Sequence, residues 1–348
     1  MKYIFFATAC CFIISFYSCN SNSKTENQES VSPKDSNLGR VEIYDNSALA
    51  LVDTNINIEV IGKGYNWSEG PVWLADKKML IFSDVPENKI YSWKEGDTAK
   101  LYLTPSGYTD TAVRIGENGS NGLTLDRNGK LLLCQSGNRQ VVRLNAPLDD
   151  PKPNFEVLSA KYKGKRFNSP NDLVTDKKNN IYFTDPIYGL PKGADDPTRE
   201  MKFEGVYKIT TDGKTTLLID SIPRPNGIAL SHDEKILYVG SSDDVHTKWF
   251  AYNLDENGNI KSGGVLLDGT ELKAKATVKQ GADGFKIDDN GNIFSAGPDG
   301  INIISPQGKL LALIRIYDRR VSNCVFNETK DILFVTADDI ALKIKLHK

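Results

Sequence analysis

The sequence has little of what many enzyme active sites use. It holds three histidines and five cysteines among 348 residues, and no Gly-x-Ser-x-Gly stretch. A covalent mechanism with a serine or cysteine nucleophile is therefore not indicated. The sequence also lacks a large net charge, because its 43 Lys and Arg nearly balance its 45 Asp and Glu. Its charge therefore does not favour nucleic acid as a partner. Runs with a helical period are scarce after residue 40, and this scarcity predicts an all-β protein.

The N-terminus carries the longest apolar run, "MKYIFFATACCFIISFYSC". It predicts a signal peptide over residues 1–18 rather than a membrane span, because the run is short and poorly flanked. The small residue Ser18 before Cys19 resembles a bacterial lipoprotein signal, which implies cleavage before Cys19 and acylation of its thiol; a plain secretory signal is the alternative. Residues 19–40 would then hold the lipidated cysteine and a disordered tether, since this stretch has almost nothing apolar to bury. We expect an exported, membrane-anchored lipoprotein in the periplasm or at the cell surface, with no other membrane contact.

Six segments of the remaining chain align without a gap. Each has a short apolar strand, a polar turn rich in Asp, Asn, Lys and Gly, and a second apolar strand beginning ten residues after the start. A β-hairpin repeated at a period of about 50 residues is typical of a propeller, so we predict a six-bladed β-propeller over residues 41–348. The segments start at Glu69, Asn121, Asn171, Asn226, Asp283 and Ser322, and their second strands start at Met79, Leu131, Ile181, Ile236, Ile293 and Ile332.

The sixth segment leaves too few residues for a four-stranded blade. The stretch 41–64 contains strand-like pieces, and it is predicted to supply the missing outer strand or strands and so close the ring. Cys134 and Cys324 lie in apolar strands of different repeats. They are therefore predicted to be small core residues rather than a disulfide.

The first residue of every hairpin carries a side-chain oxygen. Because the innermost strands of a propeller line its channel, these oxygens should converge at one mouth. Two carboxylates with amide oxygens, and no His or Cys, suit a hard cation, and Ca²⁺ accepts such ligands more readily than Mg²⁺. A divalent metal, with Ca²⁺ as the first choice, is therefore predicted there. Ser322 is the poorest ligand of the six. The alternative is ordinary turn chemistry, since Asn-Gly and Asp-Gly pairs are common in turns.

Several stretches resemble the SMP-30/gluconolactonase family, in its bacterial gluconolactonase-like branch. They include "WSEGPVWL", "NSPNDLVTD", "RPNGIALSHDEKILYV" and "ADGFKIDDNGNIFSAGPDGINIISPQGK". The resemblance implies a six-bladed propeller with a divalent metal, usually calcium, in the channel, and hydrolysis of sugar-acid lactones. The metal ligands that it implies are Glu69, Asn171, Asn226 and Asp283, with Asp283 also as the general base.

The chain departs from the family pattern near the substrate. Bacterial relatives commonly read Cys-Glu-His where this chain has Cys134-Gln135-Ser136, and some animal members place an arginine where Ser169 stands. Arg166 lies nearby. We therefore predict Asn121 and Arg166 as substrate contacts.

The function predicted is metal-dependent hydrolysis of a small-molecule lactone. The cation would act as a Lewis acid on the lactone carbonyl, and Asp283 would take a proton from the attacking water. One alternative is a broader aryl esterase or lactonase. Another is a non-catalytic binding propeller that keeps its calcium, because a fold alone does not fix a function.

Overall fold

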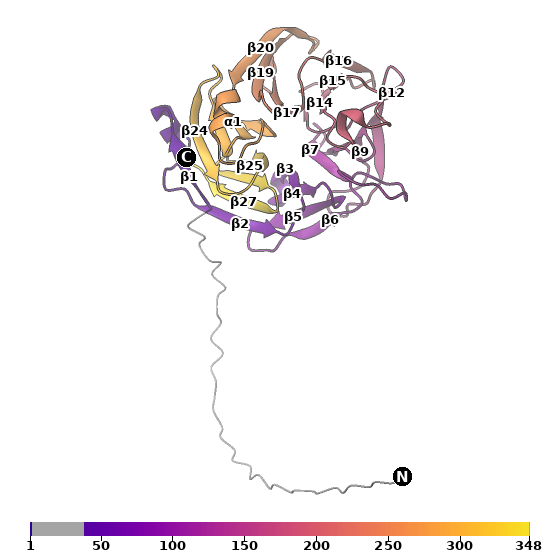
Figure 1. Cartoon of the computed structure of the whole chain (residues 1–348), viewed down its shortest axis with the longest axis horizontal. Coiled ribbons are helices and arrows are strands. Elements are labelled where there is room, and N and C mark those ends of the chain that lie inside the picture. Colours follow the sequence, from indigo (N-terminus) through magenta and orange to yellow (C-terminus); the bar gives the residue numbers. More distant parts are fainter. Residues whose placement is uncertain (2–37, 348) are drawn as a thin grey trace. The chain divides into compact units, whose positions relative to one another are not determined.

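The structure is a computed structural model in which residues 38–347 are described, together with Met1. Their strands form six antiparallel sheets arranged as the blades of a β-propeller (Figure 1). The all-β, six-bladed prediction is confirmed. The predicted signal peptide and Cys19 lie outside the described residues. The short helical elements are η1 (Asn46–Ala50), η2 (Ala75–Lys77), η3 (Gly193–Asp195) and α1 (Thr270–Lys275).

The first four blades follow the chain from the inside of the ring outward. Blade 1 consists of β3 (Ser68–Leu74), β4 (Met79–Asp84), β5 (Lys89–Lys94) and β6 (Lys100–Leu103). Blade 2 consists of β7 (Ser120–Leu125), β8 (Leu131–Gln135), β9 (Gln140–Leu144) and β10 (Phe155–Ser159). Blade 3 consists of β13 (Leu173–Thr175), β14 (Ile181–Asp185), β15 (Gly205–Ile209) and β16 (Thr215–Ile219). Blade 4 consists of β17 (Pro225–Leu230), β18 (Ile236–Ser241), β19 (Lys248–Leu254) and β20 (Ile260–Asp268).

The last two blades take strands from both ends of the described chain. Blade 5 consists of β21 (Phe285–Ile287), β22 (Ile293–Gly297), β23 (Gly300–Ile304) and β24 (Leu310–Ile316), and β1 (Gly39–Ile43) pairs with β24 as a fifth strand. Blade 6 consists of β25 (Val321–Phe326), β26 (Ile332–Ala337) and β27 (Ile340–Lys345), and β2 (Ile58–Lys63) is its outer strand. A small separate hairpin is formed by β11 (Lys161–Tyr162) and β12 (Lys165–Arg166).

The six inner hairpins agree with the repeat found in the sequence. The second strand of every blade begins at the residue predicted for it, from Met79 in blade 1 to Ile332 in blade 6. The innermost strands contact one another in the cyclic order β3, β7, β13, β17, β21, β25 and back to β3. This closed cycle places the starts of all six hairpins around one channel.

Ring closure follows the prediction for one strand and differs for another. β2 pairs antiparallel with β27, so an early segment completes the last blade as expected. β1 instead extends the neighbouring blade 5, with Gly39 opposite Ile316. Gly39 and Arg40, placed in the tether by the sequence, are thus strand residues. Glycine is required at position 39 because a Cβ there would lie 2.0 Å from Arg315 O.

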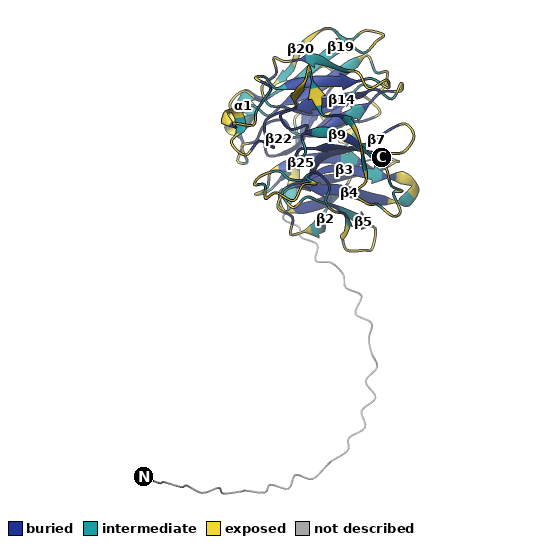
Figure 2. Ribbon diagram, turned by 90° about the vertical axis from the view of Figure 1, so that its right-hand side faces the viewer, coloured by how far each residue is buried: buried dark blue, intermediate teal, exposed yellow. Residues whose placement is uncertain are grey.

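The hydrophobic core is divided among the interfaces between blades. Six clusters of buried side chains each join two neighbouring blades, and the outermost strand is the least buried part of each blade (Figure 2). At the seam between blades 6 and 1, the rings of Trp73 and Phe334 stack with centroids 4.9 Å apart. Cys134 and Cys324 are free, buried and in different clusters, which confirms that they are core residues. The described residues contain no helix long and apolar enough to cross a membrane.

Candidate functional site

Five of the six hairpin starts meet in one cavity. Its volume is about 280 Å³, and it lies among the innermost strands and the loops next to them. Ser322 is not among its lining residues. The Ser322 hydroxyl donates to Ser68 O at 2.6 Å, and so it joins blade 6 to blade 1. The hairpin starts that line the cavity are Glu69, Asn121, Asn171, Asn226 and Asp283.

The beginnings of the inner strands place these five side chains. In β3 the pairing with β4 skips from Glu69 to Val72, and β7 and β17 show the same shift after their first residue. In blades 3 and 5 the inner strand begins two residues after Asn171 and Asp283. A bulge bends a strand and turns a side chain out of its regular direction, often beside an active site. A bulge therefore lies at the hairpin start in blades 1, 2 and 4, whereas Asn171 and Asp283 lie just ahead of a regular inner strand.

The glycines that follow four of these residues have a packing role. A Cβ on Gly70 would come within 2.2 Å of Asn121 O, and one on Gly227 within 2.3 Å of Asp283 O. Both oxygens belong to the backbone of the next blade, so a side chain does not fit. The Asn-Gly and Asp-Gly pairs thus allow adjacent blades to approach at the channel, which simple turn chemistry would not require.

The two carboxyl groups of the site are poorly compensated. Burial raises the pKa of Glu69 to about 8, although its Oε2 accepts a hydrogen bond from the Gly70 N–H at 2.6 Å. Burial, and then the neighbouring charge of Glu69, raise the pKa of Asp283 well above its ordinary value. The Asp283 Oδ1 accepts a hydrogen bond from the Gly284 N–H at 3.1 Å. Two desolvated carboxyls that repel each other would both be stabilised as anions by a bound cation.

Amide oxygens of the site are unpartnered in a similar way. Asn121 Oδ1 and Asn171 Oδ1 are buried and have no hydrogen-bond partner among the described residues. Asn226 Nδ2 donates to Ser242 Oγ at 3.1 Å, which leaves its oxygen for a ligand. Together with two carboxylates, these oxygens fit a hard cation such as Ca²⁺. No three His, Cys, Asp or Glu side chains between residues 38 and 347 form a metal cluster, so the fit depends on the amides.

A second polar group, missed by the sequence reasoning, supports Glu69. Asn323 Nδ2 donates to Glu69 Oε2 at 3.2 Å, and Lys286 Nζ donates to Asn323 Oδ1 at 3.3 Å. Asp172 is buried beside them; burial raises its pKa, and the charge of Lys286 opposes that rise. Asp172 and Asn323 stand at the position that is glycine in the other four blades. Asn323 orients Glu69 through its hydrogen bond, and Lys286 brings one positive charge near the buried carboxyls.

Loops outside the repeat supply further cavity residues that sequence reasoning also missed. Glu117, Tyr188 and Gln280 line the cavity, and each precedes or follows a blade's inner strands. Arg166, predicted as a substrate contact, is exposed on β12, where its guanidinium donates to Asn138 O at 3.4 Å. It is not among the lining residues. Its role in substrate binding stays a prediction, whereas Asn121 does reach the cavity.

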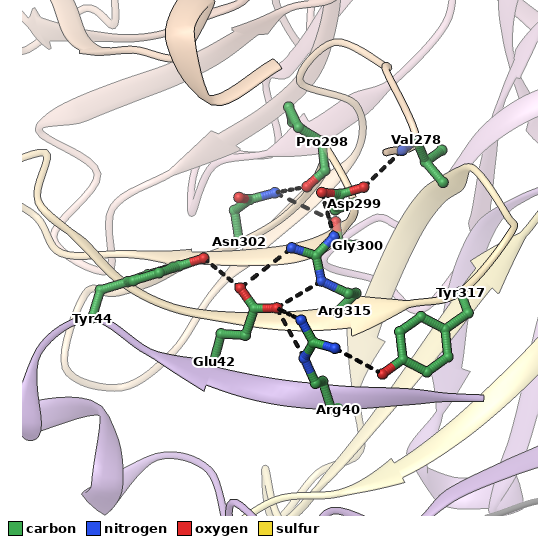
Figure 3. Close-up of polar contacts among 10 residues, drawn as sticks. All are labelled: Arg40, Glu42, Tyr44, Val278, Pro298, Asp299, Gly300, Asn302, Arg315 and Tyr317. Atoms are coloured by element: carbon green, nitrogen blue, oxygen red, sulfur yellow. Dashed lines mark hydrogen bonds and ion pairs between the residues drawn. The ribbon is translucent and has the colours of Figure 1, made fainter. Parts of the chain in front are cut away.

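The loop that carries Gln280 and Asp283 is anchored near Val278 by a series of hydrogen bonds and ion pairs (Figure 3). Asp299 Oδ1 accepts from the Val278 N–H at 2.7 Å, and its other oxygen forms an ion pair with Arg315. Arg315 Nε in turn donates to Glu42 Oε1, on β1, at 2.7 Å. These interactions connect the first described strand to one wall of the cavity.

The chain matches known proteins over most of its length. The family model described as SMP-30/Gluconolactonase/LRE-like region matches residues 67–339. A gluconolactonase of Zymomonas mobilis is 36% identical over 313 residues, which cover 89% of this chain and 87% of that protein. The diisopropyl-fluorophosphatase of Loligo vulgaris is 26% identical over 283 residues, which cover 77% of this chain and 85% of that protein. A solved gluconolactonase structure from Xanthomonas campestris is 25% identical with a TM-score of 0.75, covering 89% of this chain and 96% of that one.

The fold and the cavity define a six-bladed propeller with an oxygen-lined channel mouth. With a family model matched over more than half of its residues, the chain belongs to the SMP-30/gluconolactonase/LRE-like family. The family predicted from the short sequence stretches is thus confirmed.

Proposed function

We propose that this protein is a metal-dependent lactone hydrolase that opens lactones of sugar acids. The observation that carries the proposal is the convergence of Glu69, Asn121, Asn171, Asn226 and Asp283 on one cavity, with buried carboxyls and unpartnered amide oxygens. The similarity to the Zymomonas mobilis gluconolactonase over 89% of the chain supports the substrate class.

Four residues would hold the metal: Glu69, Asn171, Asn226 and Asp283. Their oxygens suit Ca²⁺ best, since Mg²⁺ prefers a tighter octahedral shell with more water. When bound, the cation supplies a Lewis acid that polarises the lactone carbonyl and stabilises developing negative charge. Asn323 and Gly70 hold Glu69 Oε2 in place through hydrogen bonds of 3.2 and 2.6 Å.

Asp283 is the residue placed to move a proton. The Gly284 N–H occupies its Oδ1, so Oδ2 is the oxygen left to take a proton from the attacking water. The same carboxyl can return that proton to the ring oxygen when the carbon–oxygen bond of the lactone breaks, which leaves a hydroxy acid. Asn121 Oδ1, buried without a partner, can accept a hydrogen bond from a substrate hydroxyl.

A second candidate is a broader esterase that also accepts esters with good leaving groups. The similarity to the Loligo vulgaris diisopropyl-fluorophosphatase favours this candidate, because the name of that relative denotes a substrate that is not a lactone. The same metal and base could serve both substrates, so leaving-group preference would separate the two candidates.

The test is a substrate panel measured in a pH-stat, with calcium and with a chelator. Sugar lactones, aliphatic lactones and aryl esters should be compared with the buffer rate. Sugar lactones should be hydrolysed fastest, and the chelator should abolish the gain. A calcium-loaded protein that accelerates none of these reactions would favour a binding propeller instead.

We also propose that the protein is exported and anchored by acylation of Cys19, which rests on the N-terminal sequence. Cys19→Ala should release the protein from the membrane fraction or block its processing, and incorporation of a fatty-acid probe should be lost. The variant Cys134→Ala, which alters a buried core cysteine, is the matched control. If the Cys19 variant remained labelled and membrane-bound, the anchor would have to be another one.

A further inference from the structure

We propose that Glu117 selects hydroxylated lactones, by accepting a hydrogen bond from a hydroxyl of the substrate. This inference rests on the proposed lactonase activity and goes further by assigning its specificity to a residue outside the metal site. Glu117 lies in the loop between β6 and β7 and lines the same cavity as Asn121 and Asp283.

The carboxyl of Glu117 lacks a partner. Its Oε2 is buried, and it has no hydrogen bond among the described residues. No ion pair of Glu117 is found there either. Burial raises the pKa of Glu117 to about 7, and the charge of Arg114 opposes the rise only in part. A buried oxygen without a partner is costly, so its place in a ligand cavity points to a ligand that completes it.

Contacts within the loop hold the backbone of Glu117 in place. Arg114 donates through Nη1 to Glu117 O and through Nη2 to Gly189 O, so its guanidinium is used on backbone carbonyls. On the other side of Glu117, the Gly119 N–H donates to Val85 O at 2.7 Å, and the Tyr108 N–H donates to Asn118 O at 2.6 Å. The backbone on both sides of Glu117 is therefore tied down, which favours a built contact over a mobile surface glutamate.

The neighbouring side chains indicate what the ligand must offer. This carboxyl keeps an acceptor oxygen whether or not it is ionised, so a ligand that donates a hydrogen bond can complete it. Lys273, Lys279 and Arg320 line the cavity beside four carboxyls, so with a cation held by Glu69 and Asp283 an ammonium ligand gains no net attraction there. A neutral hydroxyl meets both conditions.

A second acceptor in the cavity suits a ligand with several hydroxyls. Gln280 Nε2 donates to Val321 O at 2.6 Å, which fixes its amide, and its Oε1 is buried without a partner among residues 38–347. Glu117 and Gln280 lie on different loops, so a ligand would need donors at separate positions to satisfy both. A sugar lactone has such donors, whereas an unsubstituted lactone has none.

The experiment compares one hydroxylated and one unsubstituted lactone. D-glucono-δ-lactone and δ-valerolactone have the same ring size, and kcat/KM for each should be measured with calcium-loaded wild-type protein, Glu117→Leu and Glu117→Gln. We expect Glu117→Leu to lower kcat/KM for the sugar lactone about 10- to 100-fold, as for the loss of one hydrogen bond to a charged group. For δ-valerolactone the change should be less than about threefold. Glu117→Gln keeps one acceptor oxygen, so its kcat/KM for the sugar lactone should lie between those of the wild type and Glu117→Leu.

Controls separate this role from others. Glu256→Leu, at an exposed glutamate of the β19–β20 turn, is the matched control and should leave both rates unchanged. Calcium affinity, measured by titration calorimetry, should be the same in wild type and both Glu117 variants. If Glu117→Leu does not fold, Glu117→Gln must still show the selective loss.

Equal losses on both lactones, no loss on either, or a large fall in calcium affinity would each overturn the assignment while leaving the lactonase itself in place. A wild-type protein inactive on both lactones would remove the proposed function, and the inference with it.

Discussion

Two groups of carboxylates in this molecule have opposite surroundings. On the outer side, Glu42 and Asp299 share the guanidinium of Arg315, and these interactions lower the pKa of Glu42 to about 2. At the channel, Glu69 and Asp283 have no such partner, and burial raises the pKa of both. The outer group is complete within the protein and stabilises the fold. The inner group is completed only by something that binds, which is typical of a functional site.

The largest expected effect comes from removing the proposed base, Asp283, from the inner group. Asp283→Asn keeps the size and an amide oxygen but removes the charge and the proton acceptor. Turnover of a sugar lactone should fall about 10²- to 10⁴-fold, even at calcium concentrations that restore occupancy. If saturating calcium recovered most of the rate, Asp283 would be a ligand and not the base.

The second effect concerns the cation that we propose for the inner group. Calcium at about 100 times its Kd should stabilise the wild-type protein by about 2.7 kcal/mol, and a chelator should reverse this gain in a thermal melt. Glu69→Gln should lose most of the calcium response. Its metal-free form should be about as stable as metal-free wild type near pH 7, because a pKa of about 8 leaves most of Glu69 uncharged when no cation is bound. A Glu69→Gln protein with an unchanged calcium response would place the cation elsewhere.

A smaller effect is expected when the outer group is broken. Glu42→Gln removes a carboxylate that accepts from Arg315 at 2.7 Å and from the Tyr44 hydroxyl at 2.9 Å. The free energy of unfolding should fall by about 1 kcal/mol, measured by urea denaturation, with calcium affinity unchanged. Glu59→Gln, which alters a weaker contact with Lys343 at 3.6 Å, is the control and should change stability less.

The smallest effect is a pH dependence of the same residue. Because the pKa of Glu42 is lower in the folded protein, its contribution to stability is present above its unfolded pKa of about 4.5 and is lost as the pH falls toward 2. The difference in melting temperature between wild type and Glu42→Gln should therefore shrink over this range. A difference that stayed constant down to pH 2 would mean that charge is not what matters at Glu42.

The part of the structure that the sequence predicted is the part that repeats. The hairpin starts share an oxygen-bearing side chain, a glycine follows four of the five that line the cavity, and the second strand begins ten residues later in every blade. This shared pattern aligned all six starts from the sequence, and five of them line one cavity. Ser322 shares the register but donates its hydrogen bonds within the protein.

The rest of the cavity could not be read from the sequence because loops have no shared register. Glu117 and Gln280 come from the β6–β7 and β20–β21 connections, of which only the second contains α1, and only packing of the whole ring brings them to the site. Arg166 was predicted from its nearness in sequence to Asn171, but the β11–β12 hairpin carries it to an exposed position. Asp172 and Asn323 had a signal: each interrupts a position that is glycine in the other four blades.

The order in which the chain enters the ring has a mechanical consequence. A pull on the chain ahead of Gly39 would load β1 first, and β1 is joined to β24 by residue pairs running from Gly39–Ile316 to Ile43–Ala312. When the pull is directed across blade 5 and away from β24, these pairs would open one after another, beginning at Gly39–Ile316. The buried Val52 and the pairing of β2 with β27 come later along the chain. In that case β1 would separate from β24 before any force reached the pairing of β2 with β27, which closes the ring.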